Sequence, residues 1–88
     1  MEFKNKVVMI TGSTGGIGKA CAVLYAKDEA LLALLGRSTE KLEALRKELG
    51  LPADRCLLFA GDISKEAYVR KTVQETLDRF GRIDVLIN

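Results

Sequence analysis

The stretch that decides the fold of this 88-residue chain is Thr11-Gly12-Ser13-Thr14-Gly15-Gly16-Ile17-Gly18. It comes after a short apolar run at 6–10, which favours a strand, and it precedes a segment whose apolar residues recur at helical spacing. Glycines at such a turn let the backbone bend sharply and approach a ligand closely. The first N–H groups of a helix lack partners within it, and together with the helix dipole they favour a bound anion.

This glycine loop has three interpretations. It can be an ordinary tight turn between a strand and a helix. It can be a P-loop, because Gly18-Lys19 resembles the end of that motif. However, five residues rather than four separate Gly12 from Gly18, and Ala20 stands where a magnesium-binding hydroxyl is needed. The third interpretation is a dinucleotide-binding loop with the spacing G-x-x-x-G-x-G, and the loop alone does not separate it from the simple turn.

Outside the loop, apolar runs alternate with amphipathic segments. The expected strands are 6–10, 31–35, 56–60 and 83–87. The expected helices run from Ile17 to about Asp28, from a cap at Ser38 or Thr39 to Gly50, and from a cap at Ser64 to Gly81. Their expected inner faces are Ile17, Ala20, Cys21, Leu24 and Tyr25, then Leu42, Leu45 and Leu49, then Val69, Val73, Leu77 and Phe80.

This β-α-β-α-β-α-β order implies a parallel sheet with crossover helices. Right-handed crossovers place the first two helices on one face of the sheet. With the strand order 3-2-1-4, the third helix crosses back on the other face. Open α/β sheets bind ligands at such a switch, here between the first and fourth strands.

Composition narrows the function classes. The formal net charge is +2 without a basic block, so nucleic-acid binding has no support, and no apolar run approaches the length of a membrane span. The absence of His removes His-based metal sites and Ser-His triads. Cys21 and Cys56 lie far apart in the sequence and are expected to be reduced thiols. We therefore expect a cytoplasmic protein with no membrane, nucleic-acid or metal partner.

Three segments in register carry a resemblance to a known family. TGSTGGIG resembles the TGxxxGxG motif of short-chain dehydrogenases/reductases. Gly61-Asp62-Ile63 resembles the family's Asp and apolar residue after the third strand, and 84–88 resembles its fourth strand, which runs into Asn-Asn-Ala-Gly. The resemblance implies a Rossmann-type open sheet truncated after the fourth strand, with 1–88 as the N-terminal part of a single NAD(P)-binding domain.

The resemblance also implies a function. The complete protein would transfer hydride between a nicotinamide cofactor and an alcohol or ketone, would form a homo-oligomer, and would be similar to 3-oxoacyl-carrier-protein reductases. The family's catalytic Ser and Tyr-x-x-x-Lys lie downstream, and neither Tyr25 nor Tyr68 has a Lys four residues later. We therefore assign no catalytic residue. The alternatives are a non-catalytic dinucleotide-binding module and an interaction fragment.

The cofactor-binding residues are inferred from the loop and the resemblance together. They are Gly12, Ser13, Thr14, Gly16, Ile17 and Gly18 around the pyrophosphate, Arg37 and Ser38 at the adenosine ribose, Asp62 and Ile63 at the adenine, and Asn88 near the nicotinamide ribose. Asp62 can also shape a turn or cap a helix, and this role is compatible with ligand binding.

Nucleotide choice depends on the side chains at the end of the second strand. An acidic side chain there selects NAD, and a basic one pairs with the 2′-phosphate of NADP. This chain has Gly36-Arg37-Ser38, with no carboxylate at the strand end. A guanidinium can bind a phosphate through two hydrogen bonds, and the Ser38 hydroxyl can add a third. We predict NADP rather than NAD, the alternative being that Arg37 only faces solvent.

One residue departs from the family's pattern. Glu29 stands after the first helix, where the family usually has Gly. A left-handed backbone there would cost a residue with a side chain about 1 kcal/mol or more. Either the helix ends differently in this chain, or the chain loses some stability.

Overall fold

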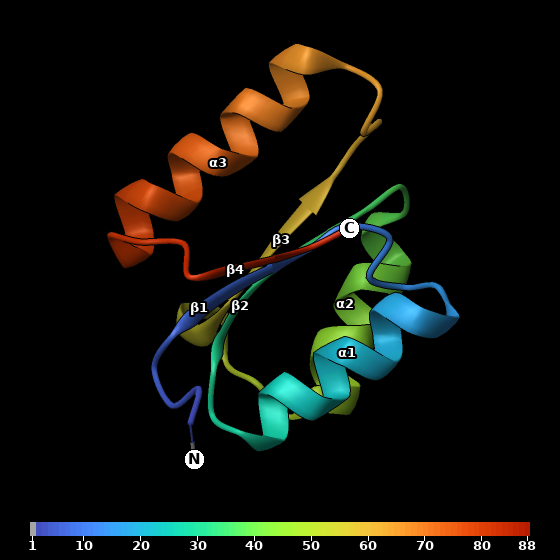
Figure 1. Ribbon diagram of the computed structural model, residues 1–88. Coiled ribbons are helices and arrows are strands. Elements are labelled where there is room, and N and C mark those ends of the chain that lie inside the picture. The colour runs from blue at the N-terminus through green and yellow to red at the C-terminus, as the bar shows by residue number, and fades with distance from the viewer. Residues whose placement is uncertain (1) are drawn as a thin grey trace.

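The computed structural model describes residues 2–88 as alternating strands and helices (Figure 1). The elements in order are β1 (Val7–Ile10), α1 (Gly16–Lys27), β2 (Leu31–Gly36), α2 (Thr39–Leu49), the 3-10 turn η1 (Ala53–Arg55), β3 (Cys56–Ala60), α3 (Glu66–Phe80) and β4 (Val85–Ile87). No helix within residues 2–88 is long and apolar enough to span a membrane.

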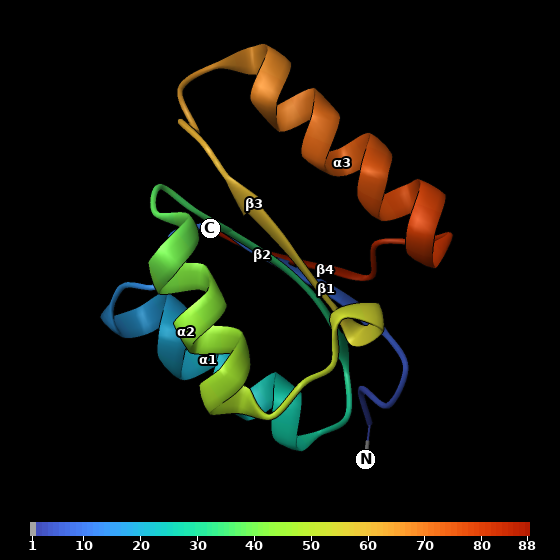
Figure 2. The ribbon, with the colours of Figure 1, turned by 180° about the vertical axis from the view of Figure 1, so that it is seen from behind.

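The four strands form one parallel sheet in the order β3-β2-β1-β4, as predicted. Val8 pairs with Leu32 on one side and with Val85 on the other. Helices α1 and α2 cover one face of the sheet and α3 covers the other, a three-layer arrangement visible from both sides (Figures 1 and 2). The expected Rossmann-type order is therefore confirmed.

Alternate side chains of the central strands fill two separate cores. On the side of α1 and α2, the larger cluster includes Val8, Ile10, Leu32 and Leu34, all fully buried. On the side of α3, a smaller cluster of Met9, Ala33 and Leu35 packs against half-buried side chains. Burial on both faces explains why β1 and β2 are continuous apolar runs rather than alternating ones.

The face of α1 that meets the sheet agrees with the prediction at Cys21 and Tyr25, which pack against the core, and differs at the other three positions. Ile17 and Leu24, expected inside, are 83% and 67% exposed, and Ala20 is also exposed, whereas Ala22 is fully buried. Nearly every residue of this helix is apolar, so periodicity cannot select its inner face. The selection comes from size, because Gly18, Ala22 and Ala26 recur at i, i+4 and i+8 and let the helix approach closely.

The inner face of α3 includes Val73, as predicted, but is otherwise rotated from the predicted stripe. Its fully buried residues are Thr72 and Thr76, while Leu77 is 40% exposed. Each threonine hydroxyl donates to a backbone carbonyl of the same helix, at 2.7 Å to Val69 and to Thr72. These hydrogen bonds satisfy the hydroxyls, so threonine can occupy interior positions that the apolar pattern did not select.

Three of the helix ends carry information about stability. Ser38 caps α2 as predicted, since its Oγ accepts from the Lys41 amide at 3.2 Å. The Ser64 prediction is wrong, because Lys65 occupies the N-cap of α3 and Ser64 bonds to Asp62 instead. At the end of α1, Glu29 adopts the left-handed backbone with φ 61°.

Candidate functional site

The glycine loop is a tight turn anchored to the neighbouring strand. Gly12 has φ 57°, a left-handed value that suits glycine, and its carbonyl accepts from the Gly15 amide at 3.1 Å. The amide and hydroxyl of Ser13 both donate to the Leu35 carbonyl at 3.0 Å. Ser13 is fully buried, so its hydroxyl holds the loop against β2, and its expected role at the pyrophosphate stays a prediction.

Gly18 determines how closely α1 approaches this loop. A Cβ atom on Gly18 would overlap the Gly12 carbonyl oxygen and would lie 2.8 Å from the Gly12 carbonyl carbon. The start of α1 therefore lies directly against the backbone of the loop that follows β1. By contrast, a Cβ atom on Gly16 would meet open space.

The start of α1 presents unpartnered amides. Gly15 is the N-cap residue and supplies no side-chain hydrogen bond, and the first turn carries no acidic side chain. Within residues 2–88, no intrachain hydrogen bond uses the amides of Gly16, Ile17 or Gly18. Such free amides at the positive end of a helix dipole are suited to a phosphate.

A pocket of about 370 Å³ opens beside the loop, at the carboxyl ends of β1, β2 and β3. Five residues predicted from the sequence line it: Gly12, Thr14, Arg37, Ser38 and Ile63. Five others were not predicted: Leu35, Gly36, Lys41, Gly61 and Tyr68. The only charged lining residues are Arg37 and Lys41, both cationic.

Tyr68 and Gly61 shape the wall of this pocket that belongs to β3 and α3. The Tyr68 hydroxyl donates to the Phe59 carbonyl at 2.6 Å, and burial raises the pKa of the phenol. A Cβ atom on Gly61 would overlap the Tyr68 ring. In the sequence, Gly61 stands out only as part of a motif, and a tyrosine inside an amphipathic helix gives no signal of a binding role.

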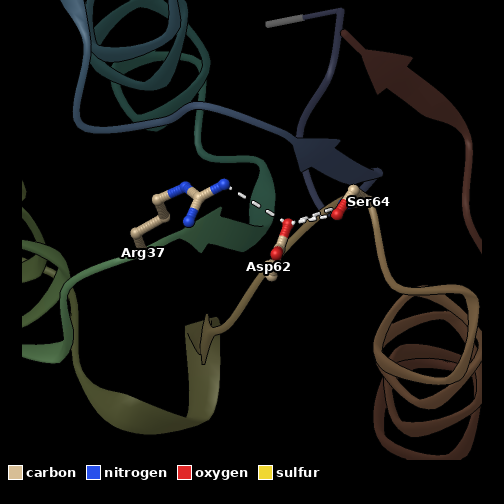
Figure 3. A network of polar contacts seen from close by, with 3 residues as sticks. All are labelled: Arg37, Asp62 and Ser64. Carbon is tan, nitrogen blue, oxygen red and sulfur yellow. Dashed lines mark hydrogen bonds and ion pairs between the residues drawn. The ribbon is translucent and has the colours of Figure 1, made fainter.

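Asp62 lies at the rim of the pocket in a network with Arg37 and Ser64 (Figure 3). Its Oδ1 accepts from the Ser64 hydroxyl at 2.7 Å and from the Ser64 amide at 2.9 Å, and it lies 3.3 Å from Arg37 Nη2. The Ser64 hydrogen bonds, and then the Arg37 charge, lower the pKa of Asp62. Ser64 thus holds the carboxylate in place, and the exposed ion pair with Arg37 is weak enough to exchange for a ligand.

Asn88 lies at the end of β4, beside the start of the glycine loop. Its Oδ1 accepts from the Thr11 hydroxyl at 3.0 Å, and the Thr11 amide donates to the Ile87 carbonyl at 2.9 Å. These bonds bring Asn88 to the switch between β1 and β4. Asn88 and Asp62 do not line the 370 Å³ pocket, nor do Gly16, Ile17 and Gly18, which form the start of α1 after the pocket-lining Thr14.

The fold, the loop and the pocket together define an α/β protein with a dinucleotide-type glycine loop at the carboxyl ends of its strands. The family described as short chain dehydrogenase matches residues 6–88. The chain belongs to this family, and the resemblance inferred from its three motifs is confirmed.

Known relatives extend well beyond the length of this chain. Uncharacterized oxidoreductase YhdF of Bacillus subtilis (strain 168) is 39% identical over 88 residues, which cover 99% of this chain and 30% of the relative. L-Sorbose reductase from Gluconobacter frateurii, solved with NADPH and L-sorbose, matches with a TM-score of 0.84 and 33% identity over 100% of this chain and 35% of its own. The chain therefore spans about a third of the length of the proteins that it matches.

A third relative bears on the predicted likeness to acyl-carrier-protein reductases. The 3-ketoacyl-(acyl-carrier-protein) reductase from Brucella melitensis, solved with NADH, has a TM-score of 0.84 and 37% identity over 96% of this chain and 33% of its own. It is one neighbour among several with different substrates, so the likeness does not single out this reductase. Because neighbours were solved with NADH and with NADPH, the preference of this chain depends on its own residues.

Proposed function

We propose that this chain binds NADP(H) and forms the cofactor-binding part of an oxidoreductase acting on alcohol or carbonyl substrates. One observation carries the nucleotide preference: the pocket beside the glycine loop has two cationic lining residues, Arg37 and Lys41, and no acidic one. A carboxylate after β2 would favour the free ribose hydroxyls of NAD, whereas a guanidinium there favours a phosphate.

The residues present fit a dinucleotide from its adenosine end to its pyrophosphate. The free amides of Gly16–Gly18 would hold the pyrophosphate, and the missing side chain of Gly18 lets the helix start lie against the loop. Arg37 and Ser38 would hold the 2′-phosphate. Asp62 would accept from the adenine amino group while Ile63 packs against the ring, and Asn88 would lie towards the nicotinamide ribose.

The bound nicotinamide would supply the hydride acceptor or donor. Relatives are named as an 11-beta-hydroxysteroid dehydrogenase, a 3-ketoacyl-(acyl-carrier-protein) reductase and an L-sorbose reductase, so we propose the substrate only as a class. By family resemblance, we further propose that the complete protein is a homo-oligomer in the cytoplasm.

Calorimetry of the 88-residue chain with NADP⁺ and NAD⁺ tests this function. We expect NADP⁺ to bind more tightly, and Arg37→Asp to abolish or reverse the preference. Arg70→Asp is the matched control, because Arg70 and Arg37 are both 78% exposed and Arg70 does not line the pocket. Equal affinity for the two nucleotides, or an unchanged preference in Arg37→Asp, would contradict the NADP assignment. A folded chain that binds neither nucleotide would contradict the whole proposal.

A further inference from the structure

We propose that Lys41 is a second residue that reads the 2′-phosphate, and that without it Arg37 gives little preference for NADP(H). This inference rests on the proposed function and deepens it, because it assigns nucleotide selectivity to a side chain outside the glycine loop and beyond the end of β2. It begins from the lining of the pocket, where Lys41 joins Arg37 and Ser38.

The charges around Arg37 show why a second cation matters. Asp62 lies 3.3 Å from Arg37 Nη2, and its low pKa keeps it ionised at neutral pH. The two groups together carry no net charge, and the carboxylate itself repels a phosphate dianion. Lys41 restores a net positive charge on this side of the pocket, where the phosphate would bind.

Lys41 is also free to act on a ligand. Within residues 2–88, no carboxylate forms an ion pair with it. Lys19, which shares a neighbouring pocket with Lys41, is instead paired with Glu48 at 3.1 Å. Lys41 lies in the first turn of α2 beside Glu40, which forms no ion pair with it in residues 2–88 and does not line the pocket.

The N-cap hydrogen bond of α2 joins Lys41 to Ser38, the third residue proposed to bind the phosphate. The Lys41 amide donates to Ser38 Oγ at 3.2 Å, so the oxygen is engaged as an acceptor. The hydroxyl hydrogen of Ser38 remains available to a phosphate oxygen, since a hydroxyl can accept and donate at once. The Arg37 guanidinium, the Ser38 hydroxyl and the Lys41 ammonium thus all come from one short segment, the turn after β2 and the first turn of α2.

The experiment compares two probes that differ only in the 2′-phosphate, adenosine 2′,5′-bisphosphate and 5′-AMP, by calorimetry on the 88-residue chain. Lys41→Met removes the charge and keeps the aliphatic stem. We expect it to weaken binding of the bisphosphate about two- to fivefold, as for loss of one exposed ion pair, and to leave binding of 5′-AMP unchanged. Lys47→Met is the control, because Lys47 is exposed on the same helix and does not line the pocket.

The outcomes separate this inference from the proposed function. If Arg37→Asp removes the preference for the bisphosphate while Lys41→Met leaves it intact, the proposed function stands and the role of Lys41 is refuted. Equal losses in Lys41→Met and Lys47→Met, or an equal loss for both probes, would refute it as well. If the folded wild-type chain binds neither probe, the proposed function and this inference both fail.

Discussion

Single backbone positions set the geometry of the nucleotide site. Gly18 is the clearest case, because the space beside its Cα is filled by the backbone of Gly12 and Ser13. Backbone cannot move aside as the end of a flexible side chain can. The glycine motif in this chain is therefore as much a packing requirement as a ligand-binding one.

Replacing Gly18 by Ala should separate α1 from the loop. We expect a loss of about 1–3 kcal/mol in unfolding free energy, as for overpacking elsewhere, or failure to fold. Gly16→Ala is the matched control, because its Cβ meets open space and the helix gains a better helix former, so its stability should stay the same or rise. Thermal unfolding of both variants checks this. Equal effects of the two substitutions would show that Gly18 is not the tight position.

Glu29 holds a backbone conformation that its residue type disfavours. It comes directly after the cap of α1 with φ 61°, and its amide and that of Ala30 bond back to Ala26 at 3.0 Å and Tyr25 at 3.1 Å. The end of α2 makes the same pair of bonds around Gly50, with φ 70°. The two helices thus end in the same motif, once with glycine and once without.

Glu29→Gly should therefore stabilise the chain. We expect a gain of about 1 kcal/mol in unfolding free energy, from relief of the left-handed strain. The bonds that the Glu29 carbonyl accepts from Asn5 and Arg55 involve only backbone on its side and remain. Urea denaturation measures the gain, and Gly50→Ala should show a similar loss. A less stable Glu29→Gly variant would mean that the glutamate side chain contributes more than the strain removes.

At the scale of elements, α3 shows why apolar periodicity alone misplaces a helix face. Its predicted stripe includes Leu77, yet the sheet side is taken by Thr72 and Thr76, with Val73 and Tyr68 packing beside them. The hydroxyls bond within the helix, so their burial leaves no polar group unsatisfied. If α3 were rotated about its axis to bury Leu77, the side chains that now face β1 and β2 would move away from the sheet.

The orientation of α3 can be tested with one charge at two adjacent positions. Thr76→Asp should destabilise the chain by several kcal/mol, because it places a carboxylate without a partner in a fully buried position. Leu77→Asp should have a much smaller effect, since Leu77 is 40% exposed and the helix dipole acts similarly on both sites. Chemical denaturation distinguishes them, and a larger effect at Leu77 would place the predicted stripe inside after all.

Strand β4 is joined to β1 through a carboxylate. Asp84 Oδ2 accepts from the Val7 amide at 2.8 Å, the Asp84 amide donates to the Val7 carbonyl at 2.9 Å, and Asp84 Oδ1 pairs with Arg82. The Val7 hydrogen bond, and then Arg82, lower the pKa of Asp84 in the folded state. The charged carboxylate is thus part of the contact that holds this edge strand.

The lowered pKa of Asp84 determines how stability depends on pH. A carboxyl whose pKa is lower when folded contributes stability that is present above its unfolded pKa and is lost as pH falls through the folded pKa. We expect unfolding free energy to fall below about pH 4, and Asp84→Asn to be less stable at neutral pH but less sensitive to acid. Urea denaturation at a series of acidic to neutral pH values measures this dependence. Asp62, whose pKa is also lowered, accounts for part of the pH dependence that remains in Asp84→Asn. An unchanged acid response in Asp84→Asn would exclude Asp84 as a contributor.

For the whole molecule, the notable feature is apolar surface left exposed on α1 and on the edge strand. Leu24 on α1 is 67% exposed, and Leu86 on the edge strand β4 is 59% exposed. Leu86 pairs in register with Met9, whose side chain belongs to the cluster under α3, so α3 does not extend over the β4 end of this face. Exposed edge strands with apolar side chains favour association.

We expect the 88-residue chain to self-associate in a concentration-dependent manner. Leu86→Lys should reduce association by placing a charge on the edge strand, and combining it with Leu24→Lys should reduce it further. Sedimentation velocity over a range of concentrations measures this, with thermal unfolding to confirm that both variants stay folded. A wild-type chain that remains monomeric, or a folded double variant that associates as before, would show that these side chains do not mediate contact.

Local signals in the sequence were enough to predict the order of elements and a parallel sheet, and the three motifs that resemble the family supplied the strand order 3-2-1-4. These signals are β-branched runs, the caps at Ser38, Gly50 and Gly81, and a glycine loop between a strand and a helix. The strained position at Glu29 was indicated by comparison with the family's pattern, which usually has Gly after the first helix, and the structure confirms a left-handed backbone there.

Which residues face each other was settled by tertiary packing alone. Packing placed the small residues of α1 and the threonines of α3 against the sheet, and it buried the Ser13 hydroxyl. It also paired Arg37 with Asp62. Lys41 and Tyr68 became part of the pocket lining for the same reason. The physical reason is that close packing depends on the sizes of side chains from segments far apart in the sequence. Ion pairing likewise depends on which strand ends the fold brings side by side. Neither quantity is periodic along the chain, so neither can be read from one segment alone.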